Sequence, residues 1–212
     1  MNQYGWVQGL SAMLILLGCW NGQAQEQAKA SFSQVVVKAF ALENEKKYAE
    51  AYELYSQALT IRDDSPTVWL RRAHTASMLG KVDEVAEDLK IAISKPPISM
   101  TDYLTVAWFR ATVPFVPLRD GTLAVTYAQK ALQETESIEA YDAMAAGYAE
   151  MGNFTQARKM AMQGIKRFPA SPRIPAMKAR VELYNQKKTF SEVWGPSDTA
   201  LPRKVQDALK TN

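Results

Sequence analysis

The sequence predicts an all-α fold in which a pair of helices repeats about every 34 residues. Three segments with similar patterns align with one another, and Ala51 in the first corresponds to Val85 in the second. Within each segment, small or apolar residues recur at i, i+4 and i+7, which is one face of a helix. A fixed period of roughly 20–50 residues is typical of stacked repeats, so the period sets the architecture.

The aligned segments are "KKYAEAYELYSQALTIRDD", "GKVDEVAEDLKIAISKPP" and "GNFTQARKMAMQGIKRFP". Their shared positions hold Ala51, Val85 and Ala157, then Tyr55, Leu89 and Ala161, and finally Ala58, Ala92 and Gly164. Because most of these side chains are small, we expect a neighbouring helix to approach each segment closely.

These residues resemble the tetratricopeptide repeat, a helix-turn-helix unit of about 34 residues. The resemblance implies a right-handed α-solenoid of about four repeats, at residues 32–65, 66–99, 100–137 and 138–171. The matching positions hold large aromatic residues (Trp69, Tyr103, Tyr141), small residues (Ala39, Ala73, Ala107, Ala145), turn glycines (Gly80, Gly152) and terminal prolines (Pro97, Pro169). Repeat 1 departs from the pattern, since Val35 replaces the aromatic residue and Asp63 the final proline.

After the repeats, the chain divides into a closing helix and a basic tail. Residues 172–187 are predicted to form a helix that caps the array, because the end of a solenoid needs a polar outer face. Residues 188–212 are predicted to form a turn at "WGPSD" and a short helix from Pro202 to Leu209. This tail either docks on the last repeat through Phe190, Val193 and Trp194 or stays mobile.

Residues 111–121, "ATVPFVPLRDG", interrupt the helical pattern with two prolines, which cannot continue a helix. Repeat 3, at 100–137, is longer than the other repeats, and its surplus falls between its two helices, so the prolines enlarge a turn and leave the period undisturbed. Arg119 and Asp120 are placed at the start of the next helix, with Asp120 as its N-cap. Phe115 and Val116 either plug the end of the helix pair or, with Arg119, form a binding loop.

The N-terminal part contains an apolar stretch, "GLSAMLILLGCW", at 9–20. It has the length of the core of a secretory signal and is shorter than a membrane span. "LLGC", which ends at Cys19, resembles a bacterial lipobox, and this resemblance implies a lipidated Cys19 and attachment to a membrane. Against a signal, the part of the chain before Cys19 carries no Lys or Arg.

Two other interpretations of this segment remain open, namely cleavage after Ala24 and a buried apolar segment in a cytoplasmic protein. We expect residues 1–24 to be a signal peptide or a lipoprotein signal. The mature protein is accordingly expected to be exported, either to the periplasm or to a membrane-anchored position in the bacterial cell envelope.

The composition offers little for catalysis. The chain has one His and one Cys, no glycine-rich phosphate loop, and carboxylates that stand at helix-surface positions. We therefore expect a protein that is not an enzyme, with no catalytic residue, metal or cofactor. The charge is uneven, because residues 25–157 hold 13 Lys+Arg against 18 Asp+Glu, whereas residues 158–212 hold 12 against 4. In an exported protein, this basic end suits anionic lipids or an acidic partner, or it is simply a solvated basic surface, and we expect no nucleic acid.

By resemblance, the first helix of each repeat lines the concave face of the solenoid. The resemblance implies that flat rings one repeat apart face this groove, namely Phe40, His74 and Trp108. Aliphatic side chains stand one helical turn before these rings, at Val36, Leu70 and Leu104. Arg71 and Arg110 flank this stripe and offer charges to acidic groups. An apolar groove suits an amphipathic helix or an extended peptide. Alternatively, the rings pack against neighbouring helices or lie under the C-terminal segment of the same chain.

The predicted function is a scaffold for protein–protein interaction that binds a partner peptide or helix in this groove. The family's clamp of Lys and Asn for a peptide carboxylate is absent, because Val36 and Phe40 stand at those positions. The alternative is a docking or regulatory subunit of an envelope enzyme system, or a binder of a small envelope ligand. It requires an enclosed pocket near Trp108 on which Arg119 or Asp120 converges. No oligomeric state follows from the sequence.

Overall fold

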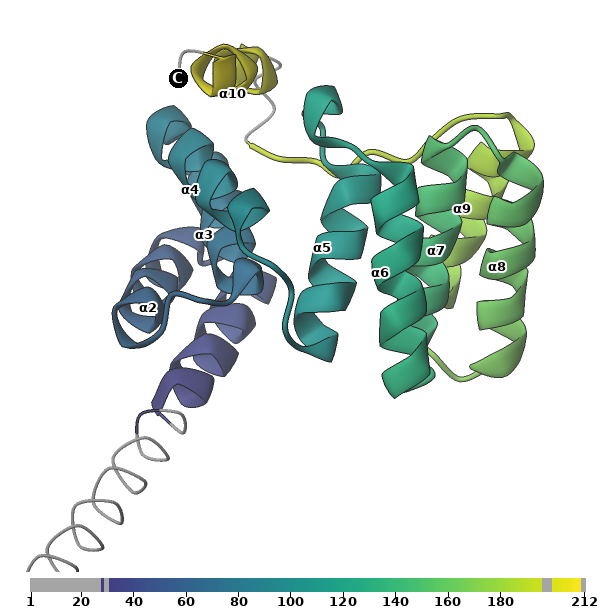
Figure 1. Ribbon diagram of the computed structural model, residues 1–212, viewed down its shortest axis with the longest axis horizontal. Helices are drawn as coiled ribbons and strands as arrows, with labels where there is room; N and C mark the ends of the chain where they lie inside the picture. Colours follow the sequence, from purple (N-terminus) through teal and green to yellow (C-terminus); the bar gives the residue numbers. More distant parts are fainter. Residues whose placement is uncertain (1–27, 29–30, 196–199, 211–212) are drawn as a thin grey trace, which may run out of the picture. The chain divides into compact units, whose positions relative to one another are not determined.

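A computed structural model describes residues 28, 31–195 and 200–210, and every regular element among them is helical, with no strand (Figure 1). The all-α prediction is thus confirmed for the described residues. The chain divides into two compact units, of which the first ends at Arg62 and the second begins at Asp63. The expected signal segment, residues 1–24 with Cys19, lies outside the described residues.

The first unit contains a helix at residues 31–44 and α2 (Tyr48–Ile61). Its core includes the fully buried Tyr55, whose hydroxyl donates a hydrogen bond to Oε2 of the buried Glu43 at 2.7 Å. The guanidinium of Arg62 lies 4.0 Å from the ring centre of Phe32. These contacts join the end of α2 to the helix that precedes it.

The second unit contains seven long helices and one short one between residues 63 and 195, followed by α10. Their bounds are α3 (Pro66–Met78), α4 (Val82–Ser94), α5 (Met100–Thr112), the 3-10 helix η1 (Val116–Leu118), α6 (Gly121–Glu134), α7 (Ile138–Glu150), α8 (Phe154–Arg167), α9 (Ile174–Asn185) and α10 (Ala200–Lys210). Figure 1 shows α5, α6, α7 and α8 side by side as neighbouring columns.

Short polar side chains start several of these helices. Ser99, Asp120, Ser137 and Asn153 each accept a hydrogen bond from the backbone N–H three residues on, which satisfies a donor that the helix itself cannot. The predicted N-cap role of Asp120 is confirmed, with its Oδ1 lying 2.8 Å from the N–H of Leu123.

Two glycines end the first helix of a pair in the way that the sequence predicts. Gly80 and Gly152 adopt φ values of +74° and +75°, a region that side-chain-bearing residues rarely occupy. A Cβ atom at either position would meet nothing within 4 Å. The backbone conformation, and not a lack of space, therefore requires glycine at these turns.

Close helix contacts hold α5 to α8 together. α7 packs against α5, α6 and α8, and at its contact with α6 two glycines, Gly121 and Gly147, allow the backbones to meet. A Cβ added at Gly121 would lie only 2.6 Å from the backbone oxygen of Gly147. Small residues at this contact thus set the distance between the two helices.

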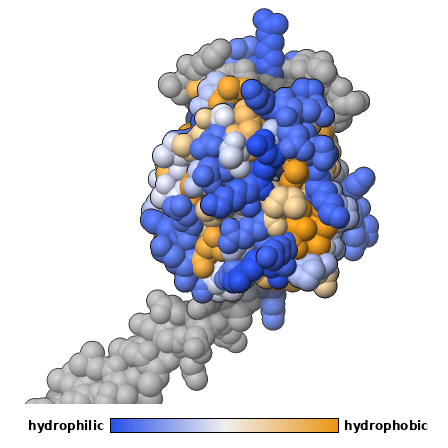
Figure 2. Space-filling view, turned by 90° about the vertical axis from the view of Figure 1, so that its right-hand side faces the viewer, coloured by the Kyte–Doolittle hydropathy of each residue, from blue (hydrophilic) through white to orange (hydrophobic). Residues whose placement is uncertain are grey.

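α9 packs against α8 and closes a core of residues from α7, α8 and α9. Met177 and Tyr184 of α9 are fully buried there against Ala157 and Ala161 of α8. The outer positions of α9, such as Lys178, are exposed. Figure 2 looks at this end of the molecule and shows a mainly hydrophilic surface with smaller hydrophobic areas between.

The α3–α4 pair meets the following helices mainly through α3 and α5, and α10 lies against α4. A buried carboxylate joins the beginnings of α3 and α5. Oδ1 of Asp102 accepts hydrogen bonds from the hydroxyls of Ser65 and Thr67, each at 2.7 Å, and Oδ2 accepts one from the hydroxyl of Ser99 at 2.9 Å. This network fixes α3 to α5 at one end.

Candidate functional site

The proline-containing turn ends α5, so the last backbone carbonyls of this helix lack helical donors. The N–H that would bond to the carbonyl of Arg110 belongs to position 114, where Pro114 has none. The N–H of Asp120 donates to that carbonyl instead, at 2.8 Å. The carbonyl of Thr112 accepts from the N–H of Glu192, also at 2.8 Å, so a residue of the C-terminal segment completes the end of α5.

Arg119 anchors the same turn to two helices. Its Nε donates to the carbonyl of Val113 at 2.6 Å, and its Nη1 lies 3.0 Å from Oε2 of Glu150 in α7. Only 9% of the Arg119 side chain is exposed. Of the other predicted loop residues, Phe115 is fully buried and Val116 is 62% exposed. The turn is therefore packed around Phe115 and Arg119, and Val116 alone of these three faces solvent.

Residues 188–195, which follow α9, run back along the helices and pass α5 (Figure 1). In this segment, Trp194 is buried among three rings from α3, α5 and the proline turn. The ring centres lie 5.4 Å from His74, 6.0 Å from Phe109 and 5.6 Å from Phe115. Edge-to-face and tilted geometries of this kind are favourable for aromatic pairs.

Phe190 of the same segment contacts Trp108, with 5.8 Å between the ring centres. The guanidinium of Arg180 lies 5.1 Å from the ring centre of Trp108 and 5.2 Å from that of Phe190. Arg180 itself forms a buried ion pair with Asp142 of α7. Burial raises the pKa of the Asp142 carboxyl, and the charge of Arg180 opposes this rise.

Glu192 stands between the two aromatic residues of the segment and joins them to α5. Its Oε1 accepts the indole N–H of Trp108 at 2.8 Å, and its Oε2 accepts that of Trp194 at 3.1 Å. In contrast, Val193 points away and is 78% exposed. We call His74, Trp108, Phe109 and Phe115 the aromatic row, and residues 188–195 the covering segment.

The residues of the predicted groove divide between the two units. His74 and Trp108 lie in the aromatic row, Leu70 is buried, and Arg71 and Leu104 are half-buried. Val36 and Phe40 belong to the first unit, where Val36 is half-buried and Phe40 is 42% exposed. The covering segment occupies the predicted stripe at His74 and Trp108, which corresponds to the alternative in which the chain covers its own rings.

Sequence reasoning missed Phe109 and Glu192 as members of this site, and it left Phe190, Val193 and Trp194 either docked on the last repeat or in a mobile tail. The segment instead lies on α5 and the proline turn, because the free carbonyl of Thr112 and the ring of Phe115 are found there. An aromatic pair at i and i+4 with an acid between them, "FSEVW", was the signal in the sequence.

One further buried carboxylate outside the aromatic row is paired with an arginine. Asp88 of α4 is fully buried and accepts two hydrogen bonds from Arg72, at 2.9 and 2.6 Å. Burial raises its pKa and Arg72 opposes the rise, as at Asp142. Such arginine-bound carboxylates join neighbouring helices and are poorly placed for proton transfer.

Within the part of the chain that the structure describes, no group of three or more His, Cys, Asp or Glu side chains could hold a metal ion. None of the helices at residues 31–195 and 200–210 has the length and apolar character of a membrane span. Neither the protein-family models nor the curated proteins compared with this chain match it.

Proposed function

We propose that this protein is a scaffold without enzymatic activity that binds an extended peptide of a partner protein on the aromatic row. The covering segment carries the proposal, because it is itself an extended peptide bound there. It is held by two aromatic anchors, Phe190 and Trp194, and by the carboxylate of Glu192 between them. A partner with aromatic residues at i and i+4 and an acidic residue at i+2 offers the same contacts.

The architecture that we infer is a tetratricopeptide-like solenoid. Supporting it, the first helices of three pairs begin at Pro66, Met100 and Ile138, which are the first residues of three expected repeats. The second of the two intervals between these starts is the longer one, and it contains the proline turn. A solenoid presents the first helices of its repeats on one face, and α3 and α5, which carry His74 and Trp108, are such helices.

In this proposal the covering segment competes with the partner. An external peptide binds only to molecules in which the covering segment has left the aromatic row. The apparent affinity is therefore the affinity of the free row multiplied by the fraction of such molecules. The segment is extended, and the backbone N–H groups that tie it to α5 and α3 are those of Glu192, which donates to Thr112, and Gly195, which donates to the sulfur of Met78. Exchange therefore requires mainly the loss of side-chain contacts and not the opening of a helix.

A labelled peptide of residues 189–195, "TFSEVWG", tests this proposal with the full chain. In the double variant Phe190→Ala, Trp194→Ala the covering segment loses both anchors, and we expect this variant to bind the peptide about tenfold or more tightly than the unchanged chain does. The matched control peptide carries Ala in place of Phe and Trp and should not bind. If the folded double variant binds neither peptide, the aromatic row is not a peptide site.

For localisation, we propose export to the bacterial cell envelope, and the proposal rests on the apolar stretch at 9–20 and on the small residues before Gln25. The intact mass of the mature protein, isolated from membrane and soluble fractions, tests it. A chain that starts at a diacylated Cys19 indicates a lipoprotein, whereas one that starts at Gln25 indicates a soluble exported protein. A mass that includes Met1 would contradict export.

The alternative of a small-ligand binder was expected to show a pocket near Trp108 with Arg119 or Asp120 converging on it. Arg119 is held by Val113 and Glu150, and Asp120 caps α6. Because both side chains have these structural partners, the aromatic row favours a peptide over a small ligand.

A further inference from the structure

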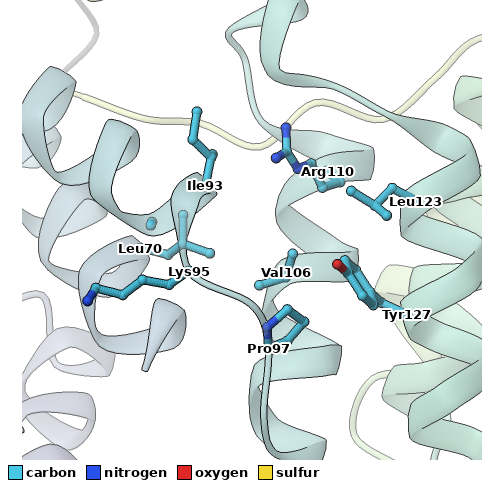
Figure 3. A pocket seen from close by; sticks show the side chains of 9 residues that line it. Leu70, Ile93, Lys95, Pro97, Val106, Arg110, Leu123 and Tyr127 are labelled. Carbon is cyan, nitrogen blue, oxygen red and sulfur yellow. The ribbon is translucent and has the colours of Figure 1, made fainter. Parts of the chain in front are cut away.

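A small pocket of about 60 Å³ lies between the α3–α4 pair and the α5–α6 pair (Figure 3). Its apolar lining residues come from both pairs: Leu70, Ala92, Ile93, Pro97, Val106 and Leu123. Its polar lining comes from Lys95, Arg110 and Tyr127. None of the residues of the aromatic row lines it, so it is a separate site.

Arg110 reaches this pocket with an incompletely paired guanidinium. Its Nη1 donates to the carbonyl of Leu118 at 3.0 Å, but its Nε is buried without a hydrogen-bond partner. Figure 3 shows the guanidinium directed from α5 toward the space that faces Ile93. Burial lowers the pKa of Arg110, with Asp120 opposing the shift, so the surroundings disfavour the charge that this group carries.

Arg110 differs in this respect from the other arginines of low exposure in the second unit. Three of them pair with a carboxylate: Arg72 with Asp88, Arg119 with Glu150 and Arg180 with Asp142. Among the described residues, no carboxylate forms an ion pair with Arg110. The acidic charge that acts on Arg110 is that of Asp120, whose Oδ1 already accepts a hydrogen bond from the N–H of Leu123. A buried guanidinium without a carboxylate partner costs free energy.

We propose that this pocket binds a small organic anion with one carboxylate and a short apolar chain. The carboxylate bonds to Arg110 and the hydroxyl of Tyr127, and the apolar chain lies against Leu70, Ile93 and Val106. The pocket has the size for such a group, since one water needs roughly 10–15 Å³ of comparable volume and a carboxylate with a short chain replaces a few waters. This inference does not rest on the proposed peptide site.

A singly charged ligand fits the charges of the lining better than a phosphate does. Arg110 supplies one unpaired positive charge, and Tyr127 supplies a neutral donor. The Lys95 ammonium lies 3.5 Å from Oδ2 of Asp63, so its charge is already shared with an acid. A doubly charged phosphate would lose more hydration than this lining restores.

Butyrate and its uncharged isostere butyramide test the proposal on the full chain, with NMR chemical shifts and the melting temperature as readouts. We expect butyrate to shift the resonances of Val106, Leu123 and Tyr127 in a saturable way and to raise the melting temperature, because a ligand of the native state stabilises it. Butyramide should do neither. Loss of the charge-assisted hydrogen bonds in Arg110→Met should weaken butyrate binding by about tenfold or more.

Arg173→Met is the matched control, because Arg173 is half-exposed and pairs with Glu139 away from the pocket. It should bind butyrate as the unchanged chain does. If Arg110→Met does not fold, Tyr127→Phe and Arg110→Lys replace it, and both should bind butyrate more weakly. The proposal would be overturned if these variants bound butyrate as tightly as the unchanged chain does. It would also be overturned if the unchanged chain bound butyramide as tightly as butyrate, or inorganic phosphate more tightly than butyrate.

The carboxylate could belong to a free acid or to the end of a peptide, and one further probe separates these sources. An N-acetylated tripeptide with a free C-terminal carboxylate is compared with butyrate. Binding of the tripeptide that depends on Arg110 and exceeds that of butyrate supports the carboxylate site and identifies a peptide end as its source. Exclusion of the tripeptide supports the site with a free acid as its source.

Discussion

Glu192 accepts a hydrogen bond from the indole N–H of Trp108 at 2.8 Å, although 84 positions separate the two residues in the chain. The other oxygen of the same carboxylate accepts the indole N–H of Trp194. One acidic side chain thus satisfies two ring donors, one from α5 and one from the covering segment. The two carboxylate oxygens of Glu192 thus serve one indole donor each.

We predict that Glu192→Gln loosens the covering segment. A glutamine has the same shape but only one acceptor oxygen, so one of the two indole N–H groups loses its partner. The expected loss is about 1–3 kcal/mol in the free energy of unfolding, with faster amide hydrogen exchange at residues 188–195. Denaturant unfolding and hydrogen exchange measure these two effects.

Ser191→Ala is the matched control, since Ser191 is exposed and lies next to Glu192. It should leave both quantities unchanged. Unchanged exchange at 188–195 in Glu192→Gln would show that the aromatic contacts alone hold the segment.

The buried ion pair between Arg180 and Asp142 adjoins the covering segment, because Arg180 also contacts Phe190. We predict that Arg180→Met destabilises the protein by about 3–5 kcal/mol at neutral pH, because it leaves a buried carboxylate without its partner. Since burial already raises the pKa of Asp142, removal of Arg180 raises it further. The folded protein then takes up a proton more readily than the unfolded chain, so the deficit should shrink as the pH falls.

Urea unfolding of Arg180→Met at several pH values measures this deficit. The double variant Asp142→Leu, Arg180→Met provides the comparison, because a buried pair replaced by apolar residues often retains stability. Arg173→Met, which breaks the exposed pair with Glu139, should change stability little. A deficit in Arg180→Met that does not depend on pH would contradict the assignment to the Asp142 charge.

Features that repeat along the chain could be predicted from the sequence. The period and the turn signals indicated where helices begin and end, so that Gly80, Gly152 and Asp120 have their expected roles. These features are local, because a positive φ or an N-cap depends on a few neighbouring residues.

The candidate site could be predicted only in part, because its contacts join distant positions. His74 and Trp108 were identified by their spacing, but Glu192 reaches Trp108 from beyond α9, and nothing in the spacing shows where an extended segment lies. Arg110 was expected to offer a charge to acidic groups. The Nε of Arg110 has no hydrogen-bond partner because no acceptor of the folded chain lies within reach of it. A sequence pattern does not reveal such an absence.

Glu136 provides a pH-dependent contribution to stability. Its carboxylate accepts hydrogen bonds from Arg167 and from the hydroxyl of Tyr141, and the bond from Arg167 is the main reason that its pKa is lowered. A lowered folded-state pKa gives a contribution that is present above the unfolded value of 4.5 and is lost as the pH falls through the folded value.

We therefore predict that Glu136→Gln is less stable than the unchanged protein at neutral pH and that the difference disappears in acid. Melting temperatures of both proteins between about pH 3 and pH 7 measure the effect. Because Arg167 is exposed, added salt should reduce the difference at neutral pH. A difference that persists below the folded-state pKa would assign the effect to packing and not to charge.

The contact between Gly121 and Gly147 makes a prediction about packing. In Gly121→Ala, the new Cβ would lie 2.6 Å from the backbone oxygen of Gly147 and 2.6 Å from Cγ of Met151. The methionine side chain can move, but the carbonyl belongs to the backbone of α7, so α6 and α7 must separate. We expect a loss of about 1–3 kcal/mol in the free energy of unfolding, as for other overpacked contacts.

Helix propensity alone predicts the opposite sign for this substitution, because alanine is a better helix former than glycine. Gly121 is the first residue of α6, so this effect should be smaller than the roughly 1 kcal/mol of a helix interior. Thr122→Ala, at the exposed neighbouring position, supplies the matched control in which propensity acts without the clash. Urea unfolding should therefore give Thr122→Ala a free energy of unfolding close to that of the unchanged protein, and Gly121→Ala a clearly lower one. Greater stability of Gly121→Ala would mean that α6 and α7 tolerate a wider separation than the packed contact indicates.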